Sequence, residues 1–303
     1  MKVSDYIDRK LSNKTRREVV TSGELQVMMS NPEFAGSVVG SGSLYNPKQQ
    51  TVYVLETECL NGLPITAPAV ARAILEQSLA AAGRRRYPKP KDWDSWQLTT
   101  HPLYCEPQTG HFIYLDIKGA FYQIYSKMPL IPGGSAGRIN CAPPWLFPYL
   151  PEDLNEWKLT RNCLVGCWRS DRTTRLKDGG LVREKQYLPT TSYHGWEFVQ
   201  KCLHYFASRA LQYGAIYCYS DGYIFPLDSN WEAFQQELAT LGIPTKEKAR
   251  GFGEVYAIGS YKIGEILTKR GCQIRAYDNI IRGNEVERDL IKLRQFNPFF
   301  WSS

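Results

Sequence analysis

Several features that would assign a protein to a class are missing from this 303-residue chain. None of its eight cysteines forms a C-x-x-C pair, and its four histidines show no metal-ligand spacing, so the sequence predicts neither a zinc module nor a disulfide framework. No apolar run reaches the roughly 18 residues that a membrane-spanning helix needs. The first residues are polar and contain no signal-peptide core, so we expect a cytoplasmic protein without membrane contact.

A G-x-x-x-x-G-K-[ST] phosphate loop is also missing, which argues against a P-loop nucleoside triphosphatase. The composition that remains is that of a globular protein, 43% hydrophobic and 22% charged, with 19 tyrosines and 8 tryptophans. The chain is long enough for one large domain or two modest ones. Its net charge of +7 is compatible with a polyanionic partner.

Sequence periodicity predicts the secondary structure. Amphipathic or Ala- and Leu-rich patterns indicate helices over residues 67–82, 151–165, 193–213 and 231–241. Alternating or apolar aromatic runs indicate strands over residues 51–56 and 112–117, a hairpin over residues 170–183 and a strand–turn–strand over residues 216–225. From residue 112 onward this order predicts an α+β fold, with helices on one face of an antiparallel sheet.

Arg84, Arg85 and Arg86 open a stretch of eight residues that contains five basic residues and two prolines. Such a stretch cannot form a regular element, and we expect a boundary near it. It is either a solvated linker or an arm that contacts nucleic-acid phosphates, because clustered Arg and Lys release counterions from the backbone.

Two aspartates end strand-like runs that lie far apart in the sequence. Asp116 follows a run of apolar and aromatic residues, and Asp221 follows another, after which the chain turns at Gly222 and continues as a strand. Taken singly, either aspartate is more typical of a turn or cap. On neighbouring strands, however, two carboxylates would suit a pair of Mg²⁺ or Mn²⁺ ions, which prefer hard oxygen ligands and clamp the oxygens of a reacting phosphate.

A third stretch lies between the two aspartates. On a helix, Lys158 and Asn162 would share one face, and Arg161 would lie beside them. The plain interpretation is a solvated basic face. The sharper one is a face that grips a triphosphate.

These blocks, in this order, resemble the palm and fingers motifs of family B DNA polymerases. The block that begins at Asp116, D-I-K-G-A-F-Y, is similar to the D-x-x-S-L-Y-P motif of that family. The block that begins at Lys158, K-L-T-R-N-C-L-V-G, is similar to its K-x-x-x-N-S-x-Y-G motif, and Y-S-D-G, which ends at Gly222, is similar to D-T-D-S. The resemblance covers about residues 112–266 and implies a palm-like antiparallel sheet.

The resemblance implies roles for the matching residues. Asp116 and Asp221 would be the catalytic ligands of two Mg²⁺ or Mn²⁺ ions. The residues that would contact the deoxynucleoside triphosphate are Lys158, Asn162, Arg161, Arg138 and Phe121. The aromatic ring of Phe121 would lie under the sugar and leave no room for a 2′-hydroxyl. Tyr261 and Lys262 would contact the DNA primer–template, and Arg84, Arg85 and Arg86 are further candidates for contact with DNA or another single-stranded nucleic acid.

The resemblance also implies a division of the chain. Residues 1–110 would be an accessory region, residues 111–266 a palm with a short fingers insertion at about 129–185, and residues 267–303 a vestigial thumb or tail. This minimal polymerase would have no exonuclease domain and would add deoxynucleotides to a 3′ end, with a protein partner for processivity or priming. The small size suggests a virus or mobile element, in which case the compartment would be the host cytoplasm.

Two other interpretations stay open. The block at Asp116 and the segment from Leu241 to Lys246 are similar to motifs of reverse transcriptases, although no second aspartate follows Asp221. The other interpretation is a palm-derived protein that binds nucleic acid or assists assembly without catalysis. It is motivated by Tyr219, which stands where family B polymerases have another acid.

Overall fold

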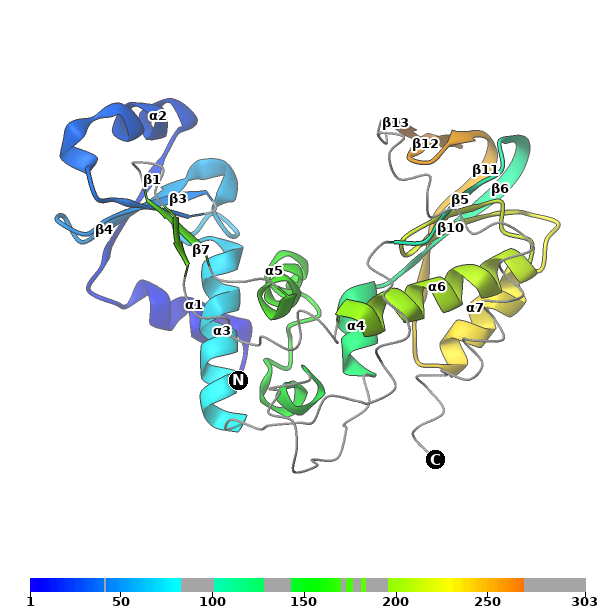
Figure 1. The fold of residues 1–303 in the computed structure, drawn as a ribbon, viewed down its shortest axis with the longest axis horizontal. Helices are drawn as coiled ribbons and strands as arrows, with labels where there is room; N and C mark the ends of the chain where they lie inside the picture. Colours follow the sequence, from blue (N-terminus) through cyan, green and yellow to red (C-terminus); the bar gives the residue numbers. More distant parts are fainter. Residues whose placement is uncertain are drawn as a thin grey trace. The chain divides into compact units, whose positions relative to one another are not determined.

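The computed structural model describes residues 1–40, 42–82, 101–127, 143–169, 173–176, 181–183 and 196–269. Within these ranges the chain has a mixed α+β fold and divides into two compact units. The first unit contains Met1–Lys89 and Pro132–Tyr193, and the second contains Pro90–Ile131 and His194–Ser303. Each unit has a sheet of its own (Figure 1).

The described residues form seven α-helices, namely α1 (Val3–Leu11), α2 (Ser22–Ser30), α3 (Ala67–Ala82), α4 (Ala120–Ser126), α5 (Lys158–Arg169), α6 (Trp196–Gln212) and α7 (Trp231–Thr240). Short 3-10 helices are η1 (Pro32–Phe34), η2 (Glu56–Glu58) and η4 (Pro143–Tyr149). The helices predicted over residues 67–82, 193–213 and 231–241 are confirmed as α3, α6 and α7.

The strands are β1 (Arg16–Val20), β2 (Val38–Gly40), β3 (Ser43–Asn46), β4 (Thr51–Leu55), β5 (Leu103–Cys105), β6 (Gln108–Ile117), β7 (Thr173–Leu176), β8 (Leu181–Arg183), β9 (Tyr217–Tyr219), β10 (Gly222–Pro226), β11 (Thr245–Ala257), β12 (Ser260–Ile263) and β13 (Ile266–Lys269). The strands predicted over residues 51–56 and 112–117 and the hairpin predicted over residues 170–183 are confirmed as β4, β6 and the β7–β8 pair.

The sheet of the first unit has the strand order β1-β4-β3-β2-β7-β8. β1 runs parallel to β4, and the other neighbours are antiparallel. Val20, Phe34, Leu44 and Tyr53 form a buried apolar cluster. The sequence predicted only β4 and the β7–β8 hairpin here. β2 pairs with β7, which lies far along the chain, so local periodicity could not show this pairing.

The helix expected from Pro151 begins instead at Lys158, so that prediction was wrong at its start. The carboxylate of Asp153 accepts a hydrogen bond from the Val3 backbone N–H at 2.8 Å and another from the Trp157 indole N–H at 3.2 Å. Residues 152–156, which include Asp153, form turns, and the helix begins only after them. Val3 lies 150 residues away in sequence, so local periodicity could not show this start.

The sheet of the second unit has the strand order β13-β12-β11-β6-β10-β9-β5, with antiparallel neighbours throughout. α6 and α7 cover one face of this sheet (Figure 1). Phe234 of α7 packs against Tyr223 and Phe225 of β10, with ring centroids 5.2 and 5.3 Å away. Because strand side chains alternate, Gly222 belongs to the opposite face, which no helix of the described residues covers. The predicted antiparallel sheet with helices on one face is confirmed.

An ion pair joins the two helices of this layer. Arg209 of α6 donates to Glu237 of α7 through Nε at 2.7 Å and Nη2 at 2.6 Å, and the Tyr213 hydroxyl donates to the same carboxylate at 2.8 Å. We expect Arg209→Met to lower the free energy of unfolding by about 2 kcal/mol, because a half-buried carboxylate loses its bidentate partner. Denaturant titration would measure the loss. Glu247→Gln, which breaks the exposed pair with Arg250, is the matched control and should leave the free energy of unfolding nearly unchanged. Equal losses would contradict the structural role of the α6–α7 pair.

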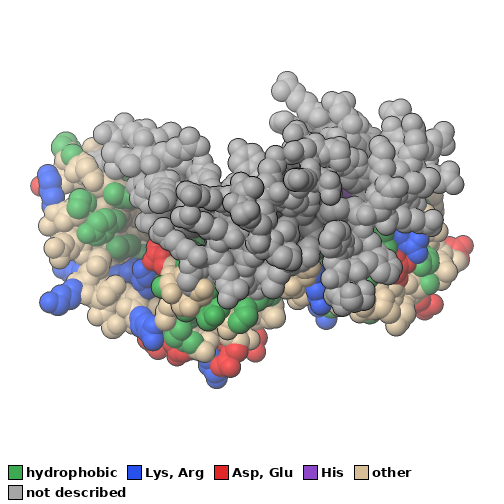
Figure 2. Space-filling model, turned by 60° about the horizontal axis from the view of Figure 1, so that its bottom comes forward, with side chains coloured by type: hydrophobic (Ala, Val, Ile, Leu, Met, Phe, Trp, Pro, Cys, Tyr) green, Lys and Arg blue, Asp and Glu red, His purple; other side chains and the backbone are tan. Residues whose placement is uncertain are grey.

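The described surface carries charges of both signs. Figure 2 shows basic and acidic side chains interspersed on the visible described face, without a single basic patch there. No helix in the described ranges is both long enough and apolar enough to cross a membrane.

Candidate two-carboxylate site

Asp116 lies near the end of β6, a central strand of the second sheet. The cross-strand register places Gly222 of β10 opposite Asp116 on one side and Lys246 of β11 opposite it on the other. Directly opposed residues point to the same face, so the Asp116 carboxylate lies on the face away from α6 and α7. The residue is only 7% exposed. The end of β6 therefore holds a charged group that water reaches poorly.

Asp221 lies in the tight turn between β9 and β10. Tyr219 pairs with Gly222 across this hairpin, so Ser220 and Asp221 form a two-residue loop. The φ angle of Ser220 is 58°, which suits a hairpin loop but is uncommon for a residue other than glycine. The Asp221 carbonyl accepts a hydrogen bond from the Ile117 backbone N–H at 3.0 Å, which ties the turn to the strand of Asp116. The two predicted acids are thus brought together.

The electrostatics of Asp221 reflect this neighbourhood. Burial, followed by the negative charge of Asp116, raises the pKa of Asp221 to about 6, while Lys248 and Lys246 act in the opposite direction. A carboxylate that is desolvated and faces a like charge ionises at a cost in free energy. The raised pKa of Asp221 therefore reflects burial first and the neighbouring negative charge second, and the two lysines offset part of both effects.

Two lysines of β11 contact Asp116. Lys246 Nζ lies 3.3 Å from Oδ2, and Lys248 Nζ lies 2.7 Å from Oδ1. The ladder between β11 and β6 shifts register between Glu247 and Ala249, which makes Lys248 the extra residue of a β-bulge. In the sequence, Lys246 indicated only a resemblance to reverse transcriptases, and no role was predicted for Lys248. The sequence shows that the two lysines are two residues apart, but it does not show which residues of β6 lie opposite them.

The ring of Tyr114 leaves no space for a side chain at Gly222. A Cβ atom on Gly222 would lie 2.5 Å from the Tyr114 hydroxyl oxygen and 2.9 Å from Cε2 of its ring. Tyr114 is itself fixed, since it is 7% exposed and packs edge-to-face on Tyr261 with ring centroids 5.3 Å apart. Glycine is therefore required here for space beneath the Tyr114 ring, and the turn itself is formed by Ser220 and Asp221.

Tyr261 and Lys262 lie on β12, on the far side of β11 from Asp116. The ring of Tyr261 is 6% exposed and packs on Tyr114 and Tyr217, whereas Lys262 is exposed. Tyr261 thus supports the aromatic core under the site. The contact of both residues with a primer–template stays a prediction.

Phe121 lies in the first turn of α4, which directly follows β6. Its ring packs edge-to-face on the imidazole of His101, with centroids 5.9 Å apart. His101 Nδ1 is also 3.4 Å from Ser220 Oγ and 3.4 Å from Gln200 Nε2. His101, for which the sequence predicted no role, therefore links Phe121 to the turn that carries Asp221. No spacing in the sequence pointed to this contact.

The predicted triphosphate face lies on α5, in the first unit. Lys158 and Asn162 are both exposed, as their spacing predicted. Arg161 is half-buried, and its Nη1 donates to the Asn155 carbonyl at 3.2 Å. The buried stripe of the helix contains Thr160, Leu164 and Trp168. The contact of this face with a triphosphate stays a prediction. The remaining predicted site residues, Arg84, Arg85, Arg86 and Arg138, lie outside the described residues.

The donor set suits a hard divalent ion. In the described part of the chain no group of three or more His, Cys, Asp or Glu side chains could hold a metal. Mg²⁺, however, is commonly held by one or two carboxylates together with substrate phosphates and water. Asp116 and Asp221 provide that number of carboxylates. The residues fit Mg²⁺ or Mn²⁺ bound jointly with a phosphate-bearing substrate.

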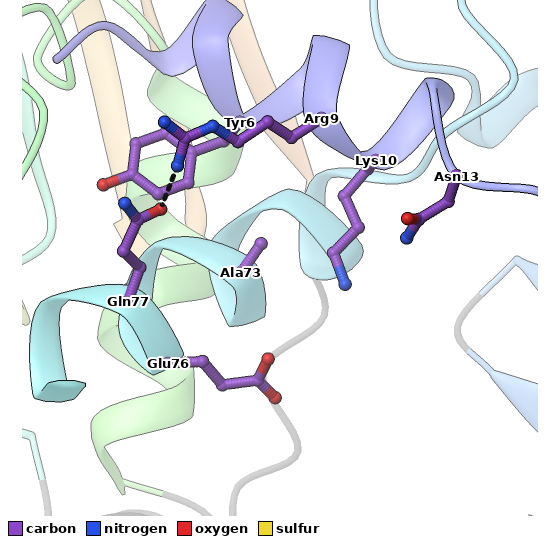
Figure 3. A pocket seen from close by; sticks show the side chains of 7 residues that line it. All are labelled: Tyr6, Arg9, Lys10, Asn13, Ala73, Glu76 and Gln77. Carbon is purple, nitrogen blue, oxygen red and sulfur yellow. Dashed lines mark hydrogen bonds between the residues drawn. The ribbon is translucent and has the colours of Figure 1, made fainter.

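A separate pocket of about 360 Å³ lies between α1 and α3 of the first unit (Figure 3). Arg9 Nη1 donates to Gln77 Oε1 across it at 3.0 Å. Its lining consists of Tyr6, Arg9, Lys10, Asn13, Ala73, Glu76 and Gln77. None of the predicted site residues lies in this pocket, and it has no pair of carboxylates.

The chain is similar in structure to the family B DNA polymerase from the hyperthermophilic archaeon Pyrobaculum calidifontis. The TM-score is 0.34 and the sequence identity 13%, over 77% of this chain and 39% of the polymerase chain. The chain thus corresponds to well under half the length of that polymerase. No protein-family model and no curated protein matches the sequence.

Proposed function

We propose that the protein is a metal-dependent nucleotidyltransferase that resembles a minimal family B DNA polymerase and adds deoxynucleotides to a 3′ end. The pairing of Asp116 with Asp221 is the observation that carries the proposal. Asp116 lies near the end of β6, and Asp221 lies in the hairpin turn directly before the adjacent antiparallel strand β10. Two carboxylates that lie close together suit divalent ions that arrive with a triphosphate.

Each part of the site would have a distinct task. Asp116 and Asp221 would hold Mg²⁺ or Mn²⁺, which when bound neutralises charge that develops on the reacting phosphate. The 3′-hydroxyl would attack the α-phosphate, with pyrophosphate as the leaving group. Phe121 would lie against the sugar and disfavour a 2′-hydroxyl. Lys158 and Asn162 would contact the triphosphate from α5, and Lys262 the nucleic-acid backbone.

The finer organisation belongs to the same proposal. The second unit would be the palm, and the segment 267–303 a reduced thumb or tail. The segment proposed as short fingers, about 129–185, falls largely in the same unit as residues 1–89. The fingers and the accessory region would then act as one body. A protein partner would supply priming or processivity.

Primer extension tests the proposal. A labelled DNA primer would be offered alone, on a DNA template and on an RNA template, with Mg²⁺ or Mn²⁺ and either deoxynucleotides or ribonucleotides. We expect extension by deoxynucleotides that requires a divalent ion, with ribonucleotides used about 10-fold less or worse, because a ring under the sugar excludes the extra hydroxyl. Nucleic-acid binding without incorporation under any condition would contradict the proposal and favour a non-catalytic palm-derived protein.

A reverse-transcriptase-like polymerase is the second candidate. The observation that favours it is the contact of Lys246 with Asp116, since Lys246 belongs to the segment that is similar to a reverse-transcriptase motif. Extension on RNA templates alone would select this candidate.

A further inference from the structure

Both oxygens of the Asp116 carboxylate are already engaged by ammonium groups. Lys246 Nζ contacts Oδ2, and Lys248 Nζ contacts Oδ1. The lysine side chains are 41% and 37% exposed, whereas the Asp116 side chain is 10% exposed. The lysines therefore lie on the solvent side of the carboxylate. An ion that enters from water therefore competes with them for the carboxylate oxygens.

A β-bulge accompanies this double engagement. Lys246 is the residue directly opposite Asp116 in β11. The extra residue between Glu247 and Ala249 is Lys248, the second lysine on the same carboxylate. Bulges re-aim side chains and are frequent next to functional sites. Lys248 also lies over the ring of Tyr114, with Nζ 5.1 Å from the ring centroid, so its position is supported from two directions.

The charges of this cluster balance without a metal. Asp116 and Asp221 together carry the charge that Lys246 and Lys248 neutralise. A divalent ion that binds alone would leave two surplus positive charges close together, which is unfavourable at short range. A divalent ion that arrives with a polyphosphate restores the balance, because the displaced ammonium groups then face phosphate oxygens.

We propose that Lys246 and Lys248 form a cationic gate on the candidate metal site. They occupy Asp116 until a divalent ion and a nucleoside triphosphate arrive together, and they then turn to the phosphates. The gate couples the binding of ion and nucleotide and disfavours the ion alone. It rests on the proposed function for the identity of the nucleotide, but the competition between lysine and ion concerns Asp116 only.

Mn²⁺ binding to the full chain tests the gate, measured by electron paramagnetic resonance of the free ion and by calorimetry. Without nucleotide, we expect the variant Lys246→Met/Lys248→Met to bind Mn²⁺ about 10-fold more tightly than wild type, because two competing cations are gone. With a non-hydrolysable deoxynucleoside triphosphate analogue, the affinity of wild type should rise by a larger factor than that of the variant. Unchanged or weaker Mn²⁺ binding by the variant overturns the gate.

The controls separate charge from folding. Lys246→Arg/Lys248→Arg keeps both charges and should keep the weak Mn²⁺ binding of wild type. Lys262→Met removes an exposed lysine of β12 and should leave Mn²⁺ affinity unchanged. Added Mn²⁺ should raise the melting temperature of the double Met variant more than that of wild type, a readout that does not need activity. A missing Mn²⁺ effect on both proteins would overturn both the gate and the metal site. Tight Mn²⁺ binding by the Met variant, with no nucleotide incorporation by wild type, would keep the gate and reject the proposed function.

Discussion

Asp221→Asn is expected to abolish nucleotidyl transfer and at the same time to make the metal-free protein more stable at neutral pH. Burial and the nearby Asp116 charge raise the pKa of Asp221 to about 6 in the folded protein, from an ordinary value of 3.8. The folded state then binds the proton more tightly, so stability falls as pH rises from the ordinary pKa to the raised one and stays low above it. Replacing the carboxyl by an amide removes this penalty, which we place at about 1–3 kcal/mol.

We expect Asp116→Asn to lose as much activity as Asp221→Asn but to make the metal-free protein less stable. Lys246 and Lys248 both depend on the Asp116 carboxylate, and without it two ammonium groups face each other. We expect a loss of about 1 kcal/mol, limited by the exposure of the lysines. Both Asn variants should slow incorporation by at least about 100-fold, the scale of losing one electrostatic contact to the reacting group.

Single-nucleotide incorporation and denaturant unfolding at two pH values would measure these effects. The stability gain of Asp221→Asn should be largest at neutral pH and shrink well below the raised pKa, where the wild-type carboxyl is protonated. Asp228→Asn, at an exposed position just after β10, is the matched control and should change neither quantity. Activity that survives both substitutions would reject this site. A destabilised Asp221→Asn would reject the electrostatic explanation.

Gly222→Ala is expected to damage the site by a packing effect alone. Its Cβ would lie 2.5 Å from the Tyr114 hydroxyl oxygen, a separation that requires the ring or the strand to move. Tyr114 is held by Tyr261 and by Lys248, so the hairpin that carries Asp221 would move instead. We expect a stability loss of about 1–3 kcal/mol. We also expect activity to fall by about 100-fold, since a displacement of about 1 Å can cost this much in rate.

Two further variants make this prediction specific. Tyr114→Phe removes the hydroxyl oxygen that would lie nearest the new methyl group, so the double variant with Gly222→Ala should recover part of the lost stability. Gly166→Ala places a Cβ on α5 with no heavy atom within 4 Å, and it should raise stability by up to about 1 kcal/mol through helix propensity. Unfolding measurements on the set would decide. A Gly222→Ala protein as stable and active as wild type would show that the Tyr114 ring yields easily.

The sequence by itself determined the elements whose signals are local. The Ala- and Leu-rich pattern predicted α3, and amphipathic spacing predicted α6 and α7 to within a few residues. The runs that end at Asp116 and Asp221 predicted two strands with acids at their tips, and the structure pairs β6 with β10 there. These predictions succeeded because periods of 2 and 3.6 residues are set by neighbouring side chains.

Only the tertiary structure decided what surrounds the two acids. The register of β11 against β6, and the bulge at Lys248, place two ammonium groups on Asp116. Tyr114 requires a glycine at position 222, and His101 links Phe121 to the turn. Strand register and cross-strand contact depend on segments distant in the chain, and each short stretch is compatible with many partners. The local sequence therefore predicted the two acids at the ends of strands, whereas strand register and packing determined which lysines contact Asp116 and how the acids are placed.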